Sequence, residues 1–100
     1  MSKTILNKAT EIKANGKPLD RNDLLTLVTN DPPEKGLTIT AMRDRMRIID
    51  AIEKAEKGDV VLEDNDFNLV RRLFDNFGWL QPHKDLLEFS DHLEEVSKQK

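Results

Sequence analysis

Three arginines within five positions are the residues whose type and spacing most suggest a binding site. Arg43, Arg45 and Arg47 lie in the stretch AMRDRMRIID. Guanidinium groups bind phosphates through paired N–H donors, so such a strip could hold a nucleic-acid backbone. On a helix, however, Arg43 and Arg47 lie about 40° apart, whereas Arg45 points to the opposite side. The three side chains therefore do not form one phosphate-binding strip.

Arg45 projects from the middle of an apolar arc that we expect to face the core. The arc consists of Met42, Ile48, Ile49 and Ile52. A buried guanidinium needs partners, because desolvating an unpaired charge costs several kcal/mol. Three arrangements satisfy Arg45: its head reaches solvent while its stem packs, it pairs with a carboxylate of residues 85–95, or it faces a partner protein. Between the last two, we favour the pair within the chain.

Other basic side chains add little to a phosphate site. Asp50 follows Arg47 by three positions and precedes Lys54 by four, so local ion pairs are expected to offset the positive charge. Arg71 and Arg72 are neighbours and diverge by about 100° on their helix. A nucleic-acid-binding regulator that uses Arg43, Arg47, Arg71 and Arg72 is therefore an alternative and not the leading interpretation.

Two acidic constellations resemble metal sites. Asp64, Asp66 and Asn68 match the first, third and fifth places of an EF-hand loop, but the sixth place is Leu69 instead of glycine. A second set consists of His83, Asp85, Glu88 and His92. This spacing also arises on any acidic helix, and we interpret His92 as a residue at the rim of the core. We expect no bound metal.

Catalytic motifs are missing from the sequence. There is no cysteine, no glycine-rich phosphate loop and no set of nucleophile, base and orienting residue. The sequence therefore predicts no catalytic residues and no cofactor, and we expect a protein that is not an enzyme.

The elements that carry these residues follow from local signals. Residues 4–19 are expected to be extended, with a hairpin or edge strand turning at Asn15 and Gly16. Asp20 should cap a helix that stops at Asp31 before two prolines. A long helix should run from Thr38 or Thr40 to about Lys57, closed by a left-handed Gly58.

The second half of the chain predicts a strand and two more helices. Residues 60–62 form a short β-branched run, which we expect to pair with the strand near residue 10. Helices are expected over about 64–76 and from Pro82 to about Val96. The predicted fold is mainly α (α+β), a small bundle of about four helices with one short two- or three-stranded sheet.

The predicted core draws on these helical faces and on the strand. Its members are Met46, Ile49, Ile52, Val61, Val70, Leu73, Phe74, Phe89 and Leu93. Trp79 follows Gly78 in a loop and is expected to close the core. The alternative for Trp79 is an exposed anchor for a partner, because tryptophan is frequent in binding hot spots.

Length and composition limit the classes of protein. One hundred residues fit a single small domain over 1–100, and we expect flexible ends at 1–3 and 97–100. No long apolar run indicates a secretory signal or membrane span, which favours a cytoplasmic protein. Residues 1–57 carry a net charge of +2 and residues 58–100 a net charge of −5. This division suggests a contact between opposite charges on two molecules and hence a monomer or weak homodimer.

The order of elements is also familiar. GKPLD precedes a leucine-rich helix, AIEKAEKGDVVLEDNDFNLVRRLF joins a helix, a strand and another helix, and a tryptophan turn leads to a closing helix. Over roughly residues 15–96 this resembles a group of small uncharacterised proteins encoded by tailed bacteriophages and prophages. The resemblance implies a protein that works in a bacterial cytoplasm or a virion and implies no catalytic residues.

The leading hypothesis is a non-enzymatic protein-interaction module, either an assembly factor or a modulator of host machinery. Its partner would be a phage or host protein. The expected contact residues are Arg43, Arg45, Arg47, Arg71, Arg72 and Trp79. A nucleic-acid-binding regulator is the first alternative, and a structural virion component is the second.

Overall fold

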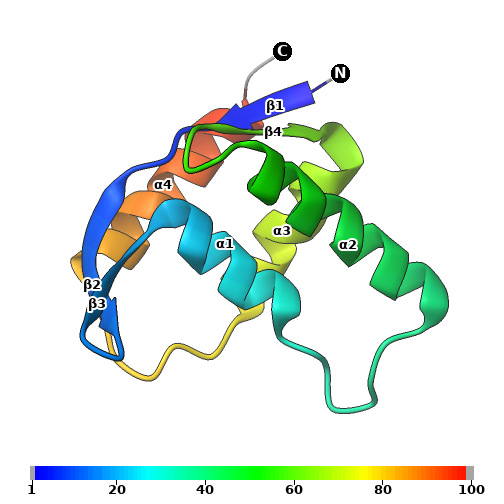
Figure 1. The fold of residues 1–100 in the computed structure, drawn as a ribbon, viewed down its shortest axis with the longest axis horizontal. Coiled ribbons are helices and arrows are strands. Elements are labelled where there is room, and N and C mark those ends of the chain that lie inside the picture. Colours follow the sequence, from blue (N-terminus) through cyan, green and yellow to red (C-terminus); the bar gives the residue numbers. More distant parts are fainter. Residues whose placement is uncertain (1, 99–100) are drawn as a thin grey trace.

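The computed structural model describes residues 2–98 (Figure 1), and in this part of the chain it contains four helices and four strands. In chain order they are β1 Ser2–Ile5, β2 Ala9–Ala14, β3 Lys17–Asp20, α1 Arg21–Asn30, α2 Ile39–Lys54, β4 Val60–Glu63, α3 Asp64–Asn76 and α4 Lys84–Ser97. The radius of gyration is 13.1 Å, as expected for a compact domain of about this length. The predicted α+β class is confirmed.

The strands form two sheets of two strands each instead of one. Asn15 and Gly16 both have positive φ angles, 53° and 80°, which suits the tight turn that joins β2 to β3 and confirms the predicted hairpin. The expected pairing of the segment near residue 10 with residues 60–62 is wrong. β4 instead pairs antiparallel with β1, so Ser2 and Lys3 lie in a strand and not in a flexible end.

The boundaries of α1 confirm the predicted cap and stop. The Asp20 carboxylate accepts a hydrogen bond from the Asp23 backbone N–H at 2.8 Å, and the Asp23 carboxylate accepts one from the Asp20 backbone N–H at 3.0 Å. This reciprocal pair satisfies donors that the first turn of a helix leaves open. The helix ends at Asn30, ahead of the two prolines.

The end of α2 differs from the expectation. The Thr38 hydroxyl caps the helix by accepting from the Ala41 backbone N–H at 3.1 Å, but the helix ends at Lys54. Glu56 and Lys57, and not Gly58, take the positive φ angles of 48° and 69°. Gly58 is needed for space, because a Cβ atom there would lie 2.9 Å from the Ala55 carbonyl oxygen.

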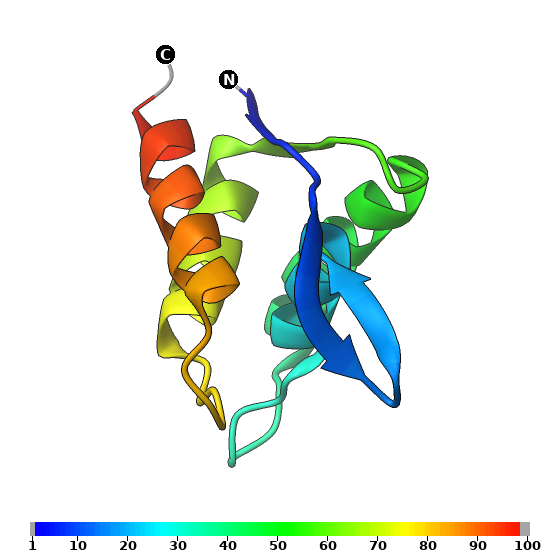
Figure 2. The same ribbon diagram turned by 90° about the vertical axis from the view of Figure 1, so that its left-hand side faces the viewer.

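The last two helices agree with the prediction except for the residue at which α4 begins. α3 spans the expected residues, whereas α4 begins at Lys84 and not at Pro82. His83 is the cap, since its Nδ1 accepts a hydrogen bond from the Asp85 backbone N–H at 3.1 Å. In Figure 2, α3 and α4 lie side by side on one side of the molecule, with α1, α2 and the β2–β3 hairpin on the other.

The core fills the space between these two groups of elements. Ile52, Val70, Phe74, Phe89 and Leu93 are buried, as predicted. Ile49 and Leu73 are half-buried. Met46 and Val61, however, are 50% and 55% exposed, so their assignment to the core is wrong. Met46 belongs to α2 and Val61 to β4.

Candidate protein-binding face of α2 and β4

Arg45 is satisfied inside the chain, but by a partner that was not expected. Its guanidinium donates hydrogen bonds to the backbone carbonyl oxygens of Thr29, at 3.0 Å, and Asp31, at 2.5 Å. These carbonyls lie at the C-terminal end of α1, which has no basic residue in its own last turn. The predicted pair with a carboxylate of residues 85–95 is therefore wrong. Arg45 instead joins α2 to the end of α1.

Arg47 joins α2 to α3. Its guanidinium lies 2.8 Å from an Asp44 oxygen and 3.1 Å from an Asp66 oxygen. The hydrogen bonds with Asp66 and then with Asp44 raise the pKa of Arg47 above its ordinary value, so the charge is held by two carboxylates. The expected local pairs of Asp50 with Arg47 and Lys54 are not formed within residues 2–98.

The remaining predicted contact residues do not converge. Arg71 pairs with Glu94 on α4 and lies 3.9 Å from an Asp75 oxygen. Arg43 and Arg72 are exposed on different helices. A surface that presents several unpaired arginines together is thus not formed by the described residues.

Trp79 closes one end of the core. Its ring centroid lies 4.5 Å from that of Phe77 and 5.3 Å from that of Phe74. Such tilted aromatic contacts stabilise a small core beyond the area they bury. Trp79 is half-buried. This agrees with the expectation that it closes the core and not with the alternative of an exposed anchor.

Asp85 and His92, two members of the set considered as a metal site, accept hydrogen bonds from backbone N–H groups of the N-terminal segment. An Asp85 oxygen accepts from the Glu11 backbone N–H at 2.7 Å, and His92 Nε2 accepts from the Leu6 backbone N–H at 3.0 Å. Burial, followed by the charge of Arg21, lowers the pKa of His92 below its ordinary value, so the neutral ring that can accept this bond is favoured. These residues attach the N-terminal segment to α4.

An exposed apolar stripe runs along the N-terminal half of α2. Ile39 is 63% exposed, Met42 is 44% exposed and Met46 is 50% exposed. With spacings of three and four residues, they share one side of the helix. They border a shallow hollow together with Arg43, Arg47 and Asp50. The apolar period of this helix is predicted correctly, but a helical period does not reveal that the fold leaves part of the apolar side uncovered.

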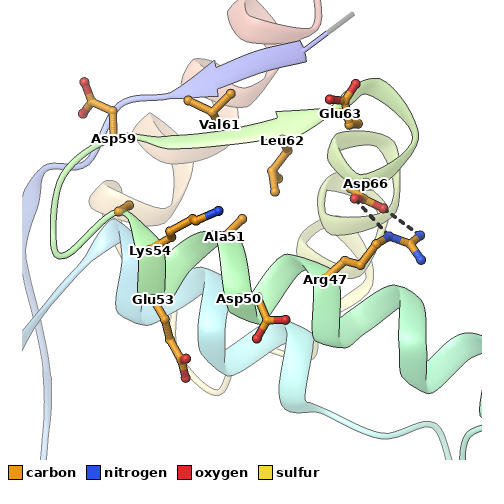
Figure 3. Close-up of a pocket in the computed structure, with 11 residues that line it drawn as sticks. Arg47, Asp50, Ala51, Glu53, Lys54, Asp59, Val61, Leu62, Glu63 and Asp66 are labelled. Carbon is orange, nitrogen blue, oxygen red and sulfur yellow. Dashed lines mark hydrogen bonds and ion pairs between the residues drawn. The ribbon is translucent and has the colours of Figure 1, made fainter.

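A groove of about 930 Å³ lies between α2 and β4. Its lining combines alkyl side chains with many charged ones: Arg47, Asp50, Ala51, Glu53, Lys54, Ala55, Asp59, Val61, Leu62, Glu63 and Asp66. Figure 3 shows Ala51 and Leu62 pointing toward the space between the two elements, with Asp50 and Glu53 on the side of α2 away from β4. Five of these residues are acidic and two are basic, and one of the acidic residues, Asp66, is paired with Arg47.

The groove forms because the chain turns back after α2. Residues 55–59 return the chain so that β4 runs beside the helix it follows. Ala51 and Ala55 are four residues apart and lie on the side of α2 that lines the groove. Small side chains at these two positions leave a hollow that larger residues would fill.

Known proteins do not supply a function by similarity. Comparisons with protein-family models, with curated proteins and with solved structures found no match. The resemblance to proteins of tailed bacteriophages and prophages therefore stays a prediction. No helix within residues 2–98 is both long enough and apolar enough to cross a membrane.

Proposed function

We propose that this protein is a non-enzymatic protein-interaction module that binds its partner through the face formed by α2 and β4. The observation that carries the proposal is the exposed stripe of Ile39, Met42 and Met46, which adjoins the groove through Arg47 and Asp50. Exposed apolar side chains gathered on one surface are typical of sites that bind other proteins. Methionine is well suited to such sites because its flexible side chain adapts to different partners.

The chemistry of the groove supports binding over catalysis. Its lining residues carry carboxylates, one guanidinium, one ammonium and alkyl groups, but no hydroxyl, thiol or imidazole. Covalent mechanisms that use serine, threonine, cysteine or histidine as nucleophile need one of these groups, and this lining has none of them. The resemblance to phage proteins adds an expected setting, in which the partner is a phage assembly protein or a component of host machinery.

The arginines support this proposal over a nucleic-acid-binding regulator. Arg45 and Arg47 are bound to carbonyl and carboxylate oxygens, and Arg71 pairs with Glu94. Phosphate binding would have to replace these contacts. It would draw on Arg43 and Arg72, which lie on different helices.

Capture from bacterial lysate with matched variants tests the proposal. We expect wild-type protein to retain a defined partner and the double variant Met42→Glu, Met46→Glu to lose it while keeping its melting temperature. Leu87→Glu is the control, because Leu87 is 70% exposed on α4, away from this face. Loss of the partner in the control, or capture unchanged in the double variant, would contradict the proposal.

A DNA titration at low salt separates the two classes. A protein-binding module should show no salt-dependent affinity for DNA, because such affinity comes from counterions released at phosphate contacts. Tight DNA binding that weakens with salt and is lost on replacing Arg43 and Arg72 would favour the regulator. Light scattering at low and high salt reports whether the protein is a monomer or a weak homodimer.

A further inference from the structure

The exposed apolar stripe of α2 has one free charge of each sign along its border. Arg43 and Asp50 are both exposed, and the side chain of neither makes a hydrogen bond or ion pair within residues 2–98. Both line the hollow beside the stripe. On the helix they lie about 10.5 Å apart along the axis and within about 20° of each other in direction. A partner of this face therefore meets a cation and an anion two turns apart on the same flank of the stripe.

The same face of a second copy offers these charges in the reverse order. When two copies of α2 pack antiparallel about a twofold axis beside Met46, Arg43 of each copy lies opposite Asp50 of the other. A twofold axis makes the surface its own complement, so one arrangement forms two ion pairs. A parallel pair would instead place Arg43 against Arg43 and Asp50 against Asp50, and like charges across a contact are unfavourable.

The apolar side chains of the two copies meet in the same arrangement. Because Met46 lies next to the axis, it contacts its own counterpart. Met42 comes to lie beside the half-buried Ile49 of the other copy, and Ile39 beside the methylene groups of Glu53. These five residues share one side of α2, because they follow one another at spacings of three and four. Flexible methionine side chains can fill the uneven space between two such helices.

The charges also select the register of the two helices. An axis beside Arg43 would lie at the middle of the stripe that runs from Ile39 to Met46. That register would bring the two Arg43 guanidinium groups together and would leave both Asp50 carboxylates without a partner. Moving the axis about one turn toward the C-terminus replaces this repulsion by two attractions and adds Ile49 to the contact.

The position of α2 leaves room for such a contact. In Figure 1, α2 runs along one edge of the molecule, with α1 on its inner side. Ala51 and Ala55 line the groove toward β4, and on the helix they point about 140–180° away from Met46. Two copies joined through the stripe therefore keep both grooves open.

We propose that a second copy of this chain binds the exposed stripe, with the two α2 helices antiparallel about a twofold axis at Met46 and joined by reciprocal Arg43–Asp50 ion pairs. This inference builds on the proposed function, since it names one partner of the same face. Few apolar side chains on each copy imply a small contact, and interfaces below about 1,200 Å² are typical of weak association. We therefore expect a dimer that dissociates on dilution, so that unfolding measured at about 1 µM reports on the monomer.

Charge reversal tests the ion pairs, with association measured at low salt by sedimentation from about 1 to about 500 µM. We expect Arg43→Asp and Asp50→Arg each to weaken the dimer about tenfold, because each variant places two pairs of like charges across the axis. An equimolar mixture of the two variants should associate about as well as wild type, since each supplies the charge that the other needs. A monomer at every concentration, or a mixture no stronger than the separate variants, would overturn the inference.

Arg72→Asp is the matched control for net charge. Arg72 is exposed on α3, and its reversal changes the net charge of the chain by the same amount as Arg43→Asp. Its dimer affinity should stay within about twofold of wild type, because exposed charges far from a contact are screened by salt. Equal weakening by Arg72→Asp and Arg43→Asp would show an effect of overall charge and would contradict the reciprocal ion pairs.

Cross-linking tests the position of the axis, because the chain contains no cysteine. Met46→Cys should form a disulfide-linked dimer under mild oxidation, since its two sulfur atoms come within bonding reach beside the axis. Leu87→Cys is the control, because Leu87 is 70% exposed on α4, and it should not cross-link under the same conditions. Faster cross-linking of Arg43→Cys than of Met46→Cys would place the axis one turn earlier and would overturn the proposed pairing.

Failure of this inference is distinguishable from failure of the proposed function. A chain that stays monomeric, while Met42→Glu, Met46→Glu still loses the captured partner, would assign the stripe to a different protein and would leave the function in place. A dimer with the expected charge dependence, but with capture unchanged in that double variant, would support the inference and would remove the stripe from the binding of other proteins.

Discussion

Replacing Arg45 with methionine should destabilise the fold by about 2–3 kcal/mol. The substitution keeps the alkyl stem and removes the guanidinium that donates to the Thr29 and Asp31 carbonyl oxygens. A hydrogen bond from a charged group contributes about 1.5–3 kcal/mol. Thr29 is 1% exposed, so its bond counts nearly in full, whereas Asp31 is exposed and its bond is discounted for competition with water. A domain of this size unfolds with about 5–15 kcal/mol, so the loss is easily measured.

Urea denaturation measures this loss as a lower midpoint at constant slope. Arg43→Met is the matched control, because Arg43 is exposed two positions earlier on the same helix and its side chain makes no hydrogen bond or ion pair within the described residues. We expect the free energy of unfolding of this control to change by less than about 0.5 kcal/mol. Arg45→Lys should recover part of the loss, since an ammonium group can still reach one carbonyl. Equal midpoints for the two methionine variants would refute the conclusion that Arg45 stabilises the fold by joining α2 to the end of α1.

Three further predictions concern stability. Phe74→Ala should cost about 3–5 kcal/mol in calorimetry or urea denaturation, because it removes a buried ring in contact with Trp79 and Phe89. Since burial and the charge of Arg21 lower the pKa of His92, the unfolded chain binds more protons near the ordinary value of 6.5. The free energy of unfolding should therefore fall as pH drops from about 7.5 to 5.5, and a pH series on His92→Gln should be flatter. Lys57→Gly should raise the melting temperature and stabilise by about 0.5–1 kcal/mol, because glycine adopts the φ of 69° without strain.

Local chemistry explains why much of the fold could be predicted. The capping box at Asp20, the cap at Thr38 and the turn at Asn15 and Gly16 each depend on residues within four positions of one another. Such signals are readable without knowing the rest of the structure. The burial of Phe74 and Phe89 is predictable for a related reason, since each belongs to a narrow apolar stripe on its helix.

Long-range pairing could not be predicted in the same way. Ser2–Ile5 is too short and mixed in character to be recognised as a strand, so the sequence predicts a partner for β4 near residue 10 and not at β1. That segment instead pairs across a two-residue turn, where closing the loop costs little entropy. Arg45 shows a related limit. Its partners are carbonyl groups of another helix end, and backbone acceptors have no signature in the sequence.

The candidate binding face shows why a helical period alone does not distinguish core from contact surface. The apolar residues of α2 cover a wide arc, and the fold buries Ile48 and Ile52 while it leaves Ile39, Met42 and Met46 exposed. The difference arises from what lies opposite the helix: α1 and β4 cover its inner side, but the described residues place no element over the stripe. Because the apolar arc of α2 is wider than the area that neighbouring elements cover, part of it stays exposed to water. This exposure costs roughly 25 cal/mol of free energy for each Å² of apolar surface. A partner that covers the stripe recovers this free energy, and the same burial that organises the core then drives binding.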